Sequence, residues 1–136
     1  AESLVCRQFL SIELTADAER EAFDYLQQQR AGQGRLNLYY CYYASLALVQ
    51  YRAPRWQEWV SEMETTLRRQ QRTTSSLAGS WDPDTKWGGY GGRVYSTALA
   101  ALCLEVFYRY ADSDAAPASP VPHWTRQNGR WTPIRR

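Results

Sequence analysis

The chain has 136 residues, 22% of them charged, and a formal net charge of only +2. This length suits one domain with a modest core, and the nearly balanced charge argues against a nucleic-acid-binding module, which usually carries a clustered basic face. The longest nearly apolar stretch, residues 94–104, is far shorter than the roughly 20 residues that a membrane-spanning helix needs, so no membrane span is expected.

The first two expected helices differ in polarity. Residues 2–10 form a short apolar helix, whereas the helix from Thr15 to Arg30 carries one apolar stripe among charged residues and glutamines. Thr15 is suited to cap the second helix, and Asp17 and Glu19 favour its N-terminal end. We therefore expect a buried first helix followed by an amphipathic one.

The third and fourth expected helices repeat this contrast. After a glycine-containing break at residues 31–34, residues 38–49 are apolar or aromatic on every side, which predicts a helix that is buried all round. Pro54 then opens a fourth helix, whose polar side faces water. Its apolar residues form one stripe: Trp56, Trp59, Val60, Met63 and Leu67.

Residues 73–92 form a polar, glycine-rich loop, and a fifth helix is expected over residues 93–110, with a centre that is apolar on every side. From residue 112 onward Asp, Ala, Ser and Pro dominate without a hydrophobic period. Such a composition does not form a core, so residues 112–136 are expected to be an irregular basic linker or disordered tail. The helical domain therefore spans residues 1–111.

The alternation of these helices is the main indication of the fold. The first, third and fifth are apolar throughout, and the second and fourth are amphipathic. A two-layer helical repeat requires this pattern, because its inner helices contact neighbours on all sides while its outer helices meet water. A plain helical bundle is the alternative.

The cysteines Cys6, Cys41 and Cys103 lie in apolar helical contexts, without pair spacing and without a nearby histidine. This pattern predicts three buried thiols. The alternative is a disulfide between two of them, with the third cysteine remaining a free thiol.

Two motifs connect the fourth and fifth helices. The pair Gln70/Gln71 is followed by Gly79-Ser80-Trp81, and residues 91–106 read Gly-Gly-Arg-Val-Tyr-Ser-Thr-Ala-Leu-Ala-Ala-Leu-Cys-Leu-Glu-Val. The combination resembles the repeats of squalene–hopene cyclases and protein prenyltransferase β subunits, in which a glutamine closes the outer helix and Gly-x-Trp precedes the next inner helix. The gap between the glutamine and the glycine is longer than in those repeats. The resemblance spans residues 4–110 and is greatest to bacterial proteins, notably from planctomycetes, that carry such repeats without an assigned activity.

The resemblance implies an all-α fold of the α/α-toroid type, built from helical hairpins. Such rings usually need about five or six hairpins, and this chain supplies about two and a half, so a partial ring is expected. A partial ring leaves apolar end faces exposed. We therefore expect the chain to be a C-terminal piece of a longer protein or to associate with its own copies.

Several catalytic motifs are missing from the sequence. The cyclases protonate a double bond with Asp-x-Asp-Asp, whereas residues 82–85, Asp-Pro-Asp-Thr, lack the third carboxylate and have the composition of a turn. Prenyltransferases bind zinc through Asp, Cys and His, but the single histidine, His123, lies in the tail and far from Cys103. A Cys-Gly-Glu-Gln thioester and a Gly-Lys-Ser/Thr phosphate loop are also missing. We expect no catalytic residue, no metal and no cofactor.

Aromatic side chains and one arginine are the candidate ligand-binding residues. Successive tyrosines of the third helix point around it, and those that face an open side would stabilise cations or stack on sugars or apolar groups. Core packing and anchoring of the repeat are the alternative roles, and Arg93 at a helix start is suited to meeting an anion. The candidates are Tyr39, Tyr40, Tyr43, Trp81, Trp87, Tyr90, Arg93 and Tyr95.

The layered pattern and the missing motifs favour a non-catalytic toroid-repeat domain that binds a protein or ligand within a larger protein. The alternative is the C-terminal portion of a terpenoid cyclase or prenyltransferase-like enzyme whose catalytic acid lies upstream of Ala1. The expected partners are the rest of a longer parent chain or further copies of this one, together with a protein or an apolar ligand. Nucleic acid is not an expected partner.

Overall fold

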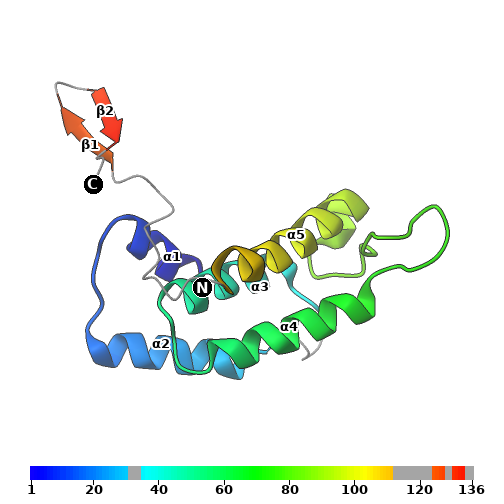
Figure 1. Cartoon of the computed structure of the whole chain (residues 1–136), viewed down its shortest axis with the longest axis horizontal. Coiled ribbons are helices and arrows are strands. Elements are labelled where there is room, and N and C mark those ends of the chain that lie inside the picture. The colour runs from blue at the N-terminus through cyan, green and yellow to red at the C-terminus, as the bar shows by residue number, and fades with distance from the viewer. Residues whose placement is uncertain (31–34, 112–123, 128–129, 134–136) are drawn as a thin grey trace.

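The computed structural model describes residues 1–30, 35–111, 124–127 and 130–133, and these contain five α-helices and one two-stranded sheet (Figure 1). The helices confirm the expected all-α class. In the described part of the chain no helix is both long and apolar enough to cross a membrane. The elements are α1 (Glu2–Phe9), α2 (Ala16–Gln28), α3 (Leu38–Gln50), α4 (Trp56–Gln70), α5 (Gly88–Ala111), β1 (Trp124–Gln127) and β2 (Arg130–Pro133).

A β-hairpin lies within the segment that the sequence predicts to be irregular. Strands β1 and β2 pair antiparallel, with Trp124 opposite Pro133 and Gln127 opposite Arg130. The sequence signal for the hairpin is the Asn-Gly dipeptide at residues 128–129, which separates two runs that contain Trp and Thr. The rest of residues 112–136 lies outside the described residues, so the linker prediction stays a prediction there.

The helices form two layers, with α3 at the centre of the inner layer (Figure 1). Helix α3 packs against α1 and against α5, and it also contacts α4 of the outer layer. Ala44, Ala47 and Leu48 of α3 are completely buried, whereas Tyr39 at its start is 40% exposed, so the prediction of a helix buried all round holds only in part. The outer layer consists of α2 and α4 (Figure 1).

Helices α1 and α5, which the sequence predicts to be buried on every side, each have an exposed side. In α1 the buried residues are Leu4 and Val5, and in α5 Val94 is 82% exposed. The reason is their position, because each lies at one end of the inner layer and packs there against α3. We call the exposed side of α5 its apolar face. Its apolar residues are Val94, Ala98, Ala101, Leu102 and Tyr108, and the exposed ion pair of Glu105 and Arg109 lies on the same side near the C-terminal end.

The outer helix α4 has one buried stripe, as its sequence pattern predicts. Trp59, Met63 and Leu67 are buried along it. The indole N–H of Trp59 donates a hydrogen bond to Ser45 Oγ of α3 at 2.9 Å. Thr15 also acts as the expected cap of α2, because its hydroxyl oxygen accepts a hydrogen bond from the N–H of Ala18 at 3.3 Å. The amphipathic pattern therefore identifies both the outer helices and the side by which α4 attaches.

The prediction of three buried thiols is wrong for Cys6, which is exposed, and holds for Cys41 and Cys103. Cys6 is exposed because α1 lies at the end of its layer and buries one edge only. Burial raises the pKa of the Cys41 thiol to about 12, and it raises the pKa of Cys103 well above the usual value. Both buried thiols therefore stay protonated at neutral pH and serve as small apolar groups.

Candidate functional site

Trp81 anchors the loop between α4 and α5. Its side chain is 4% exposed, and its indole N–H donates a hydrogen bond to the carbonyl oxygen of Leu67 at 2.9 Å. The backbone N–H of Trp81 donates to Thr97 Oγ1 of α5 at 3.2 Å, and the Gln71 side chain donates to the carbonyl oxygen of Gly79 at 3.0 Å. Trp81 therefore joins the end of α4 to α5.

The anion that Arg93 meets is the carboxylate of Asp82. The guanidinium of Arg93 donates to Asp82 and, at 3.0 Å, to Ser80 Oγ, while Arg72 Nε lies 2.8 Å from the other carboxylate oxygen. The hydrogen bonds from Arg93 and then Arg72 hold the pKa of Asp82 below its ordinary value. A proton-donating acid must keep its proton, so Asp82 has the opposite property. Residues 82–85 are a loop structure, as their turn composition predicts.

Asp82→Asn is expected to lower the melting temperature at neutral pH, because Arg72 and Arg93 then lose their shared carboxylate. Since the pKa of Asp82 is lowered in the folded protein, its contribution is present above the ordinary aspartate pKa of about 4 and is lost as the pH falls through the folded-state value. Thermal unfolding of both proteins as a function of pH should show the difference shrinking in acid. Asp84→Asn is the matched control, because this 87% exposed carboxylate pairs with Arg35 alone among the described residues.

Two glycines shape the beginning of α5. A Cβ atom on Gly88 would lie 2.1 Å from the carbonyl oxygen of Pro83, so the loop approaches the helix more closely than a side chain allows. The close approach is thus between the loop and the start of α5. Gly92 has φ 69° and ψ −169°, a conformation suited to glycine, and it interrupts the helix. The turn at residues 88–91 is therefore separate from the continuous helix that follows.

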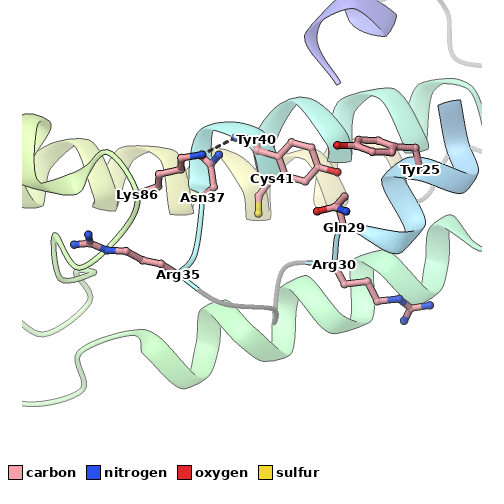
Figure 2. A pocket seen from close by; sticks show the side chains of 8 residues that line it. All are labelled: Tyr25, Gln29, Arg30, Arg35, Asn37, Tyr40, Cys41 and Lys86. Carbon is pink, nitrogen blue, oxygen red and sulfur yellow. Dashed lines mark hydrogen bonds between the residues drawn. The ribbon is translucent and has the colours of Figure 1, made fainter.

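A polar hollow of about 280 Å³ lies between the end of α2 and the start of α3 (Figure 2). Tyr25, Gln29 and Tyr40 turn toward one another there, whereas Arg30 points away toward α4 (Figure 2), where it pairs with Glu62. The buried Tyr40 hydroxyl has no hydrogen-bond partner among the described residues, and burial raises its pKa. We call this space the interlayer hollow.

The other cationic side chains that border the interlayer hollow also have partners within the protein. Arg35 pairs with Asp84 at 3.0 Å, and the ammonium group of Lys86 lies 5.8 Å from the centroid of the Trp87 ring system. Because these positive charges already have partners within the protein, we interpret the hollow as a polar contact region between the two layers and not as a ligand site.

A second hollow, the aromatic pocket, lies where the three inner helices begin. Its volume is about 490 Å³, and it is lined by Glu2 of α1, Asn37 and Tyr39 at the start of α3, Trp87 just before α5, and Tyr95 of α5. Tyr39 is 40% exposed and Trp87 is 46% exposed, so both rings are accessible from solvent. The pocket thus brings together three of the candidate residues.

Tyr43 holds the ring of Tyr39 in position, one turn further along α3. The two ring centroids are 4.9 Å apart and the rings are tilted by 57°. A hydrogen bond with Tyr43 raises the pKa of Tyr39, and burial and the charge of Glu2 raise it further. The Tyr39 phenol therefore stays neutral at physiological pH, with its ring at the pocket wall.

The remaining candidates lie elsewhere. Tyr40 borders the interlayer hollow, and Trp81 and Arg93 are bonded within the loop. Tyr90 is 91% exposed and does not line the aromatic pocket, although its ring centroid lies 6.4 Å from that of Trp87.

Glu2 and Asn37 line the pocket but were missed as site residues. Asn37 is recognisable in the sequence as a helix cap, and its Oδ1 does accept a hydrogen bond from the N–H of Tyr40 at 3.3 Å. One sequence signal could have identified them, because each stands at the beginning of an inner helix. The beginnings of neighbouring helices lie close together when the helices pack side by side in the same direction.

Within the described residues, no group of three or more His, Cys, Asp or Glu side chains is arranged to hold a metal ion. In comparisons with known proteins, no family model, no curated protein and no solved structure matches this chain.

Proposed function

We propose that this chain is a non-catalytic helical-repeat domain of the α/α-toroid type, which binds a ligand in its aromatic pocket and works within a larger assembly. The observation that carries the proposal is the convergence of Tyr39, Trp87 and Tyr95 on one hollow. Small-molecule sites are typically lined by aromatic side chains with a few polar groups, and here the polar groups are Glu2 and Asn37.

The state of Asp82 supports a binding role over an enzymatic one. Because two arginines keep this carboxylate ionised, it is unsuited to protonate a substrate. The alternative function, a portion of a cyclase-like enzyme, would therefore need a catalytic acid other than Asp82, and that hypothesis places it upstream of Ala1.

The apolar face of α5 supports the larger assembly. Val94 is almost fully exposed there and Leu102 is partly exposed, with the small Ala98 and Ala101 between them. Soluble monomers rarely leave large contiguous apolar patches in water. We propose that a further helix covers this face, contributed by a longer parent chain or by a second copy.

The pocket is tested with 3,3-dimethylbutan-1-ol, a neutral apolar probe, in saturation-transfer NMR. We expect transfer to its tert-butyl group, because that group fits between the accessible rings. Trp87→Ala should abolish the transfer, whereas Tyr90→Ala, which removes a neighbouring ring outside the pocket, should preserve it. No transfer to the native protein, or equal loss in both variants, would contradict the proposal.

Light scattering on the same samples addresses the assembly. A mass of two or more copies favours a second copy as the cover of the apolar face. A well-behaved single copy counts against the assembly, because it indicates that the chain covers its own apolar surfaces as a compact helical bundle.

A further inference from the structure

The charges around the aromatic pocket are unequal. Its lining contains one carboxylate, Glu2, and the described lining residues include no lysine, arginine or histidine. The three aromatic rings add partial negative charge on their faces. From this composition we infer that the pocket binds a small organic cation, specifically an alkylated ammonium group. The inference rests on the proposed function and adds the chemical class of the ligand.

One ammonium group of the protein already lies next to an aromatic ring of this pocket. The Lys86 ammonium lies 5.8 Å from the centroid of the Trp87 ring system. Lys86 borders the interlayer hollow and is not part of the aromatic pocket lining, so it does not fill the pocket. The indole of Trp87 therefore already attracts a cation in this fold.

The beginnings of three helices also meet here, and helix N-termini favour anions. Protein groups satisfy part of them: Asn37 Oδ1 accepts from the N–H of Tyr40 at 3.3 Å, and the N–H of Gly88 donates to the carbonyl oxygen of Thr85 at 3.1 Å. Glu2 stands in the first turn of α1. A helix end carries about half a unit of positive charge, so the full carboxylate of Glu2 more than offsets the end of α1, on which it stands.

A metal ion is a poorer match than an alkylated ammonium group. Hard cations such as calcium take about six to eight oxygen ligands, and one carboxylate with one amide cannot supply them. A volume of about 490 Å³ also far exceeds the space that a bare ion occupies. An alkylated ammonium group spreads its charge over methyl groups. Because it is only weakly hydrated, these methyl groups contact aromatic faces at a small desolvation cost.

Three probes of similar shape and different charge test the inference: choline, its neutral isostere 3,3-dimethylbutan-1-ol, and the anion 3,3-dimethylbutanoate. Each is titrated with the native chain by ¹H NMR, following the methyl resonances, which ring currents shift upfield. We expect choline to bind at least about fivefold more tightly than the neutral alcohol, since several cation–π contacts add to the attraction of Glu2. The anion should bind most weakly.

Glu2→Gln separates the charge of the site from its shape. This variant should weaken choline binding by about two- to fivefold, the range of an exposed ion pair, and leave the neutral alcohol unchanged. Glu21→Gln makes the same charge change at an exposed position of α2 and should change neither affinity.

The outcomes distinguish the inference from the proposed function. If the neutral alcohol binds as tightly as choline, or if Glu2→Gln and Glu21→Gln weaken choline equally, the cation inference is overturned and the binding domain stands. If none of the three probes binds, both proposals fail. Preference for choline that depends on Glu2, with measurable but weaker binding of the neutral alcohol, supports both.

Discussion

Trp59→Ala is expected to lower the free energy of unfolding by about 3–5 kcal/mol, the range for truncating a large buried aromatic side chain. Trp59 is 2% exposed and lies in the seam between α3 and α4. Its removal leaves a cavity and also leaves the buried Ser45 hydroxyl without its 2.9 Å hydrogen bond. Urea unfolding followed by circular dichroism measures the loss.

Two further variants make this result interpretable. Trp59→Phe keeps an aromatic ring in the seam but removes the indole N–H, so its loss should be clearly smaller than that of the alanine variant. Trp87→Ala removes an accessible indole from the pocket wall and should cost less than about 1 kcal/mol. A loss below about 1 kcal/mol for Trp59→Ala would show that the stripe of α4 does not pack on α3 as described.

Trp81→Ala is expected to cost about 3–4 kcal/mol and to loosen the loop between α4 and α5. The indole is buried, and its N–H bonds to the Leu67 carbonyl oxygen at the end of α4. The backbone of the same residue bonds to Thr97 of α5, so this one residue of the loop bonds to both helices. Hydrogen exchange should therefore accelerate in residues 71–87 by more than in α3.

Trp81→Phe is the matched variant for this position. It retains most of the buried area and loses the hydrogen bond to Leu67, so about 1–2 kcal/mol is expected. If Trp81→Ala is no more destabilising than Trp87→Ala, the anchoring role is refuted, because Trp87 is accessible to solvent and Trp81 is not.

The sequence pattern predicts the helices α3 and α4 and the buried stripe of α4, because burial there follows local composition. The same reasoning is wrong for α5, although its centre is as apolar as that of α3. The difference is that α3 has an inner-layer neighbour on each side, whereas α5 lies at an end of the layer. The number of neighbours is a property of the assembled chain, and the apolar pattern of a single helix does not contain it.

The residues of the candidate site were predictable only where residue type, and not tertiary packing, identifies them. Tyr39, Trp87 and Tyr95 are identifiable by residue type, since exposed aromatic side chains at helix ends are suited to binding. Glu2 belongs to the same pocket only because α1 packs beside α3, far away along the sequence. Its role depends on tertiary contacts that no local motif specifies.

The interruption at Gly92 also bears on the width of the aromatic pocket. Trp87 precedes the short turn before this glycine, and Tyr95 belongs to the helix after it. The torsion angles of this one residue, at φ 69°, which a side-chain-bearing residue adopts only with strain, therefore contribute to the separation of these two walls. A change in those angles would move Trp87 relative to Tyr95 and so widen or narrow the aromatic pocket, while the buried contacts of α5 with α3 stay in place.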